Sequence, residues 1–201
     1  MEAFRKVVLG AVIALLFVAV ATGTARADLV ANGGFETGNL NGWTFTPAST
    51  GSDFLVAGHV GGILPNSGNY LAAFGAGGSS DDTIAQTVTT VPGQWYTLSF
   101  ALTHNSNDNK NNFNASWNGV SVLALNNANS FGWTRYSYTV QATASTTTIS
   151  FAGRENVAWY GLDGVSVASV SAPLPPALLL FSPSLIGIAA LRRRFKKQAP
   201  V

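Results

Sequence analysis

Between residues 28 and 171 the sequence is dominated by short runs in which apolar and polar side chains alternate. The clearest run is Tyr96 to Thr103, where every second residue is large and apolar and the residues between are Thr, Ser or Ala. Alternation with a period of two predicts a β-strand with one buried face. Similar runs lie at residues 70–74, 83–88, 120–125, 136–140, 146–151 and 162–167.

Turn-forming residues separate these runs, and no segment between them shows the period of an amphipathic helix. Pro92-Gly93 predicts a turn directly before the clearest strand, and the polar segment 105–112 predicts a loop after it. Strands spaced roughly 8–12 residues apart without intervening helices predict an all-β sandwich or barrel.

The first 27 residues have the order of a secretory signal peptide. Two basic residues near the start precede an apolar stretch over residues 7–21 and the tripeptide Ala25-Arg26-Ala27, a small-x-small cleavage pattern. The stretch is shorter than the roughly 20 residues of a membrane-spanning helix. This favours cleavage before Asp28 over the alternative of an uncleaved membrane anchor.

The C-terminal segment combines a Pro-rich start, an apolar run and a basic tail. Residues 174–191 contain only apolar residues, Pro, Gly and two serines, and five basic residues follow within 192–197. Basic residues beside an apolar span tend to stay cytoplasmic. The pattern therefore predicts a hydrophobic helix that stops transfer at the inner membrane.

This order of motifs resembles the PEP-CTERM sorting signal of exopolysaccharide-producing Gram-negative bacteria, although Pro175-Pro176-Ala177 stands where Pro-Glu-Pro is commonest. The resemblance implies recognition by an exosortase, a membrane protease that removes the tail. It also implies export to the cell envelope or beyond, with transient or retained anchoring in the inner membrane. An ordinary C-terminal anchor is the alternative. The sorting residues implied are Pro175, Pro176, Ala177, Arg192, Arg193 and Arg194.

Most of the positive charge lies in the two ends of the chain. Only Lys110, Arg135 and Arg154 lie between residues 28 and 171, against eight Asp and Glu, which gives this region a net charge of −5. An acidic region without a basic stripe excludes nucleic-acid binding. The chain has no cysteine, so an exported domain must be held by packing, or by packing and a metal ion, without disulfides.

The segments that bound the strand region resemble a known fold family. Residues 30–43 contain Asn32-Gly33-Gly34-Phe35-Glu36 and end in Trp43, and residues 160–167 read Tyr-Gly-Leu-Asp-Gly-Val-Ser-Val. With residues 113–120 and 133–140, they resemble galactose-binding-like jelly rolls, a group that includes many carbohydrate-binding modules. The resemblance covers residues 29–167 and implies a jelly-roll β-sandwich. We therefore expect a signal peptide at 1–27, a sandwich at 28–171 and a sorting signal at 172–201.

The same resemblance implies a structural calcium ion, held by Glu36 and Asp163 where the first and last strands lie side by side. Calcium takes six to eight oxygen ligands, so backbone carbonyls and water would complete the shell. The alternative is that the two carboxylates only cap turns. The two histidines lack the spacing of a zinc site.

Aromatic rings outside the core are the natural carbohydrate platform, because sugar C–H faces stack on flat rings while amides bind hydroxyls. Trp43, Trp117 and Trp133 lie in framework segments, so we expect them in the core. The predicted ligand-binding residues are Trp95, His104, Asn105, Trp159 and Tyr160.

Catalytic motifs are missing from the sequence. There is no G-x-S-x-G elbow, and Asp81-Asp82 is interpreted as a pair of solvated turn acids. A hydrolase with a pair of distant acids, such as Asp53 and Glu155, is the weakest of three hypotheses. The favoured one is a non-enzymatic protein that binds extracellular polysaccharide, and the second is a structural biofilm-matrix or adhesion protein that acts through protein contacts.

Overall fold

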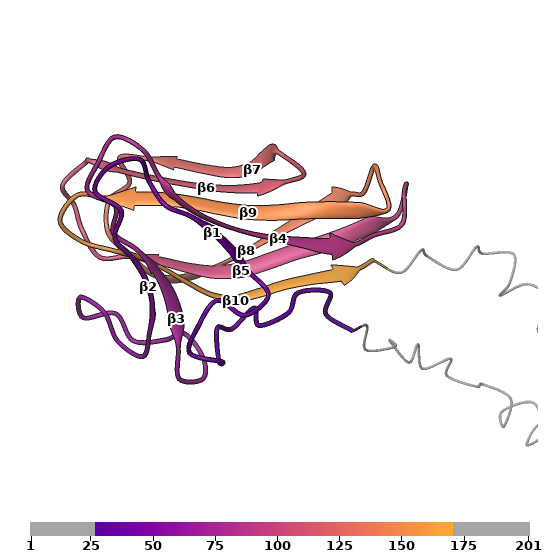
Figure 1. The fold of residues 1–201 in the computed structure, drawn as a ribbon, viewed down its shortest axis with the longest axis horizontal. Coiled ribbons are helices and arrows are strands. Elements are labelled where there is room, and N and C mark those ends of the chain that lie inside the picture. Colours follow the sequence, from indigo (N-terminus) through magenta and orange to yellow (C-terminus); the bar gives the residue numbers. More distant parts are fainter. Residues whose placement is uncertain (1–26, 171–201) are drawn as a thin grey trace, which may run out of the picture.

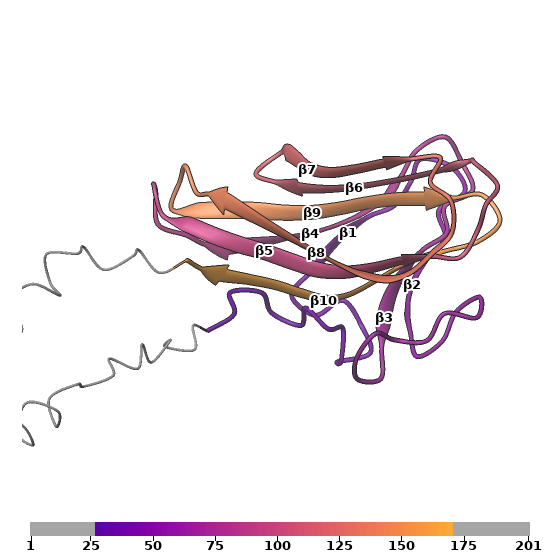
Figure 2. The same ribbon diagram turned by 180° about the vertical axis from the view of Figure 1, so that it is seen from behind.

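The computed structural model describes residues 27–170, which form two antiparallel β-sheets packed face to face (Figures 1 and 2). No helix lies within these residues. Their strands are β1 (Thr44–Thr46), β2 (Phe54–Ala57), β3 (Leu71–Phe74), β4 (Asp82–Thr89), β5 (Trp95–His104), β6 (Asn111–Trp117), β7 (Val120–Asn126), β8 (Phe131–Gln141), β9 (Thr146–Glu155) and β10 (Tyr160–Ser169).

Each sheet has five strands, and the chain crosses repeatedly between them. The strand order is β1-β4-β9-β6-β7 in the first sheet, here called sheet A, and β2-β3-β10-β5-β8 in the second, sheet B. Every neighbouring pair is antiparallel. This arrangement confirms the predicted all-β jelly-roll sandwich.

All seven runs predicted from alternation coincide with strands of the structure, with Tyr70 as the one predicted residue that lies outside, directly before β3. Strand β6 was indicated only by the family resemblance, and it begins at Asn111, inside the segment expected to be a loop. Strands β1 and β2 were not predicted. Strand β1 has three residues, all exposed, and β2 has four residues, all partly buried. Neither strand therefore shows an alternating pattern.

The core lies between the sheets and is rich in aromatic rings. On β5, Leu98, Phe100 and Leu102 are fully buried, as their spacing predicts. Phe151 of β9 contacts three other rings, those of Trp43, Phe100 and Phe113, with centroids 5.1 to 6.4 Å apart. Such pairs add to the free energy gained from burying apolar area.

The first and last segments of the described chain are joined by backbone hydrogen bonds. The amide of Leu29 donates to the carbonyl of Val167 over 2.9 Å, and the amide of Val165 donates to the carbonyl of Gly33 over 2.9 Å. Both ends of the described chain therefore emerge on the same side of the molecule (Figure 1).

Several predictions concern residues that the structure does not describe. The apolar stretch of the signal peptide and the sorting residues Pro175 to Ala177 and Arg192 to Arg194 lie outside residues 27–170. Within the described range, no helix is long and apolar enough to cross a membrane.

We expect Phe151→Ala to lower the free energy of unfolding by about 3–5 kcal/mol, because it leaves a cavity among three rings. Urea unfolding followed by tryptophan fluorescence measures the change. Val157→Ala is the control, since Val157 is 75% exposed and should change stability by no more than about 0.5 kcal/mol. An equal loss of stability in the two variants would contradict the position of Phe151 in the core.

Candidate functional site

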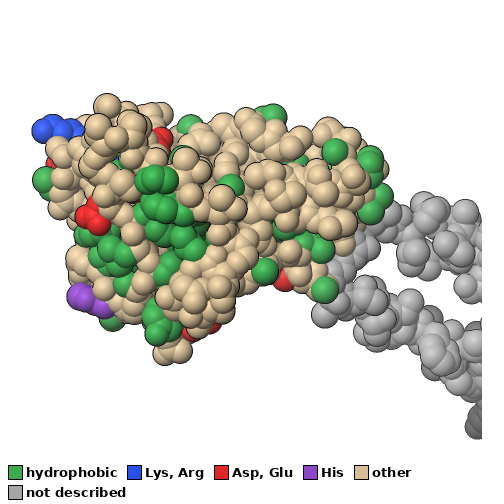
Figure 3. Space-filling model, viewed as in Figure 1, with side chains coloured by type: hydrophobic (Ala, Val, Ile, Leu, Met, Phe, Trp, Pro, Cys, Tyr) green, Lys and Arg blue, Asp and Glu red, His purple; other side chains and the backbone are tan. Residues whose placement is uncertain are grey.

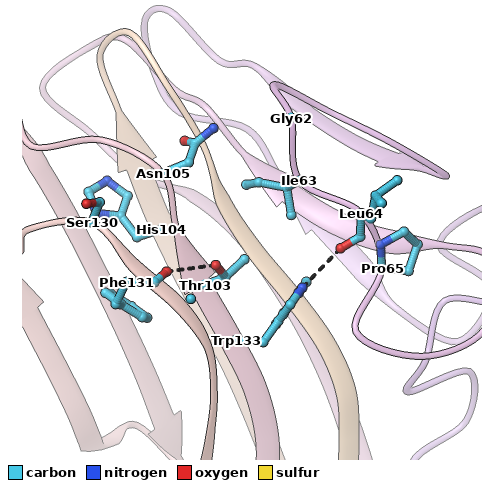
Figure 4. Close-up of a pocket in the computed structure, with 11 residues that line it drawn as sticks. Gly62, Ile63, Leu64, Pro65, Thr103, His104, Asn105, Ser130, Phe131 and Trp133 are labelled. Carbon is cyan, nitrogen blue, oxygen red and sulfur yellow. Dashed lines mark hydrogen bonds between the residues drawn. The ribbon is translucent and has the colours of Figure 1, made fainter.

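A hollow of about 560 Å³ lies at one end of sheet B. Its walls come from residues 62–65 of the loop between β2 and β3, residues 103–105 at the end of β5, and residues 130–133 at the start of β8 (Figure 4). The walls are mostly apolar and contain no Asp, Glu, Lys or Arg. A concave, mainly apolar surface with a few polar groups is typical of a binding site for an uncharged ligand.

The β2–β3 loop, residues 58–70, owes its shape to a tight turn at Gly61 and Gly62. Both glycines have positive φ, +52° and +86°, which a side chain would disfavour. The turn pairs Val60 with Ile63 through two backbone hydrogen bonds. A Cβ on Gly61 would lie 2.6 Å from Cδ1 of Trp159, so the loop packs directly on that ring.

Side-chain hydrogen bonds fasten this loop to β5 and β8. Asn105 donates from Nδ2 to the carbonyl of Gly61 over 2.7 Å, and its Oδ1 accepts from the amide of Trp159 over 2.9 Å. Trp133 donates from Nε1 to the carbonyl of Leu64 over 3.0 Å (Figure 4). Its ring is therefore held in place at the mouth of the hollow.

A second apolar cluster underlies the loop on the outer face of sheet B, separate from the main core. Its buried members are Val60, Ile63, Leu71 and Ala73, and the partly buried Leu55, Trp133 and Trp159 pack against them. In the space-filling view, hydrophobic side chains gather in the half of the molecule away from the two chain ends (Figure 3).

Glu36 and Asp163 fasten the far end of the same loop. The carboxylate of Glu36 accepts from the amides of Asn69 and Tyr70, at 2.9 and 3.2 Å. Asp163 is buried, and its carboxylate accepts from the amides of Ser67 and Gly164, at 2.9 and 2.6 Å. The two predicted metal ligands thus meet at one loop, although they are far apart in the sequence.

The pKa of Asp163 is raised above its ordinary value of 3.8 by burial. The nearby Glu36 carboxylate also raises it, whereas hydrogen bonds from the backbone amides of Ser67, Gly164 and Asn66 lower it in part.

The surroundings of these two carboxylates show how well they would suit calcium. Their oxygens face amide hydrogens, which repel a cation, and residues 27–170 contain no group of three or more His, Cys, Asp or Glu placed to hold a metal ion. The donors therefore fit the closing of a loop better than a calcium shell. Calcium binding stays a prediction.

Thermal unfolding in the presence of calcium and in the presence of a chelator tests this prediction. If the ion binds, the unfolding temperature is higher with calcium than with the chelator.

His104 and Tyr160, two of the predicted ligand-binding residues, belong to a buried polar cluster. Their rings stack with centroids 4.2 Å apart, and both side chains are essentially inaccessible. His104 Nε2 bonds to Oε2 of the buried Glu155. The Tyr160 hydroxyl donates to Oδ1 of Asn111 over 2.5 Å, and burial raises its pKa, with Glu155 adding to the effect. An exposed sugar platform therefore does not include the Tyr160 ring.

The remaining predicted ligand-binding residues are spread over sheet B. Asn105 is exposed and lines the hollow, whereas the half-buried Trp159 packs under the loop. Trp95 is 48% exposed but lies at the opposite end of β5.

The predictions for the framework tryptophans need one correction. Trp43 and Trp117 are buried in the core, as expected. Trp133 is only half-buried and lines the hollow. Thr134 pairs with the core-facing Leu102, so the alternation of side chains along β8 places the neighbouring Trp133 on the outer face.

The interpretation of Asp81-Asp82 as solvated turn acids is wrong for Asp82. Its side chain is fully buried and accepts hydrogen bonds from the amides of Ala48 and Asp53 and from the hydroxyl of Ser52. Asp81 instead forms a partly exposed ion pair with Arg154.

The strand region matches one known family. The family model described as "Protein of unknown function (DUF642)" matches residues 28–167. The chain belongs to this family. A comparison with curated proteins found no match.

The solved structures most like this DUF642 domain include carbohydrate-binding modules. TmCBM61, solved in complex with beta-1,4-galactotriose, has a TM-score of 0.56 and 13% identity, over 72% of this chain and 99% of its own. The CBM22-1 xylan-binding domain of Paenibacillus barcinonensis Xyn10C has a TM-score of 0.53 and 15% identity, over 74% and 98%.

A third similar structure is the enzymatically active domain of the Bacteriophage CBA120 tailspike protein 4. It has a TM-score of 0.55 and 18% identity over 71% of this chain, which spans only 21% of the tailspike chain. At such identities these matches establish the fold that the DUF642 domain shares with them, the jelly-roll sandwich.

The raised pKa of Asp163 predicts how stability changes with pH. The folded state binds this proton more tightly than the unfolded state, so the contribution of Asp163 to the free energy of unfolding falls as the pH rises from 3.8 through the folded-state pKa. The stability of the wild type minus that of Asp163→Asn, which cannot titrate, should therefore be larger at about pH 3.5 than at about pH 7.

Urea unfolding of both proteins across this range measures the difference. Asp108→Asn serves as the control for a general loss of charge. A difference that grows with pH would contradict the raised pKa.

Proposed function

We propose that the DUF642 domain binds extracellular polysaccharide in the hollow beside Trp133. The observation that carries the proposal is the fixed, half-buried indole at the mouth of an uncharged hollow. The proposal is supported by the similar folds of a xylan-binding domain and of a module solved in complex with beta-1,4-galactotriose.

The chemistry of the walls suits a neutral sugar. The Trp133 ring offers a flat apolar face, and Ser130 offers a hydroxyl at the exposed rim. Asn105 offers the second N–H of its Nδ2, since the first donates to the Gly61 carbonyl. The Trp133 indole is held by the Leu64 carbonyl before any ligand arrives. A ring that is already ordered loses little conformational entropy on binding, which strengthens the complex.

We propose that the protein is not an enzyme. A glycosidase needs two carboxyl groups across a cleft, and no carboxylate lines the hollow. Glu155, one of the two distant acids considered above, is buried against His104. Asp53, the other, is exposed and does not line the hollow.

The proposed place of work is outside the cell or in its envelope, reached through the signal peptide and an exosortase-type sorting step. The emergence of both chain ends on one side of the sandwich supports this, because the opposite end, which carries the hollow, can then face away from the membrane.

A structural matrix or adhesion role is the second candidate. Strand β7 lies at the edge of sheet A and contains no charged residue or proline, the features that usually block pairing with another chain. Assembly that depends on protein concentration, without added glycan, would favour this role.

We expect Trp133→Ala to weaken polysaccharide binding about tenfold or more, because it removes the central ring of the site. Affinity electrophoresis against xylan and galactan measures the effect. Trp133→Phe, which keeps a ring, should retain part of the affinity and shows that a loss does not reflect unfolding. Phe45→Ala, on the other sheet, is the control, and equal loss in that variant would contradict the assigned site.

Mass spectrometry of the native protein from its envelope fraction tests the export proposal. We expect a chain that begins at Asp28 and lacks the basic tail. An intact chain recovered from the cytosol would contradict it.

A further inference from the structure

Arg135 lies on the outer face of sheet B, close to the hollow but not among its lining residues. It follows Trp133 by two residues on β8, and both side chains lie on the face away from the core: Trp133 contacts the loop, and Arg135 contacts Ser99. A separation of two residues along a strand is about 7 Å. The guanidinium donates to Ser99, whose partner on β8 is Ser137, so it lies about four residues, or about 13 Å, along the strand from Trp133. A glycan chain of several units that extends from Trp133 along β8 therefore reaches it.

The guanidinium of Arg135 is held in position but not neutralised. Its Nη2 donates to Oγ of Ser99 over 2.9 Å, while the side chain as a whole is exposed. Among residues 27–170 the ion pairs are His104 with Glu155 and Arg154 with Asp81. Arg135 therefore has no carboxylate partner in the described part of the chain.

The carboxylate at the same level of the sheet is that of Asp163. Asp163 pairs with Ala101 on β5, and Ala101 pairs with Arg135 on β8, so two strand spacings of about 4.8 Å separate the two backbones. Both oxygens of Asp163 are occupied by the amides of Ser67 and Gly164. The loop contact thus keeps this carboxylate away from the arginine.

We propose that Arg135 forms a subsite for the carboxylate of an acidic sugar unit, such as a uronic acid, in the glycan chain that occupies the hollow. This inference rests on the proposed function. The planar guanidinium offers paired N–H donors that match the two oxygens of a carboxylate. The neutral hollow then holds an uncharged unit, and Arg135 selects a charged unit further along the same glycan chain.

The net charge of the domain does not favour acidic glycans, so any preference for them must come from Arg135 itself. With a net charge of −5 between residues 28 and 171, the domain as a whole does not attract polyanions. Preference for an acidic glycan must therefore come from a placed cation. Because Arg135 is exposed, we expect salt to weaken this preference, since ions screen charges over about 8–10 Å at physiological ionic strength.

Affinity electrophoresis of the full-length protein tests the subsite. Alginate, polygalacturonate and glucuronoxylan are each compared with their carboxyl-reduced forms, which keep the backbone and lose the charge. The wild type should bind at least one acidic form about tenfold more tightly than its reduced form. Arg135→Gln should abolish that preference and leave binding of the reduced form unchanged.

Two variants serve as controls. Arg135→Lys keeps the charge without the paired donors, so it should give an intermediate preference. Arg154→Gln removes the same charge from sheet A and should behave as the wild type. About 0.5 M salt should reduce the preference of the wild type and leave Arg135→Gln unaffected.

Equal binding of acidic and reduced forms by the wild type, or a preference that survives in Arg135→Gln, would overturn the subsite while polysaccharide binding stands. If no polysaccharide of either form is retained, the proposed function itself is contradicted. Circular dichroism of Arg135→Gln confirms that the comparison is made on folded protein.

Discussion

The attachment of the β2–β3 loop across the outer face of sheet B is the constraint on which the hollow depends. The loop supplies one wall, and four side chains from other elements hold it there: Glu36, Asn105, Trp133 and Asp163. Ordering a loop costs conformational entropy at each residue. The hydrogen bonds and the apolar cluster under residues 60–63 offset that cost, so the wall exists before a ligand binds.

The opposite wall is held by contacts on both faces of sheet B. At the end of β5, Thr103 donates from its hydroxyl to the carbonyl of Phe131 over 2.8 Å, which fixes the start of β8. His104, next along the strand, points inward to Glu155 and stacks on Tyr160. A buried polar pair of this kind favours one arrangement of its strands, because any displacement leaves a buried group without its partner. The second Glu155 oxygen, Oε1, accepts no hydrogen bond from the described residues.

The alternation was sufficient to predict an all-β sandwich or barrel, because it is a direct consequence of one buried face per strand. The resemblance to galactose-binding-like domains supplied the choice of a jelly-roll sandwich. The alternation was not sufficient for the short strands β1 and β2, which lack that pattern. Asn105 was predicted as a ligand-binding residue because its amide can bind sugar hydroxyls, and it lines the hollow. Trp133 was assigned to the core from the family resemblance, although the alternation of Tyr136, Tyr138 and Val140 in the same strand already places it on the opposite face. The burial of Asp82 and Tyr160, in contrast, depends on partners that are distant in the chain, namely Ala48 and Asn111.

Nuclear magnetic resonance of the indole N–H signals, during titration with xylan or galactan oligosaccharides, tests the central claim most directly. The chain has five tryptophans, and they occupy distinct environments. If the hollow binds sugar, the Trp133 signal shifts with saturation, while those of the buried Trp43 and Trp117 stay in place. Saturable shifts at other signals with Trp133 unmoved would contradict the account.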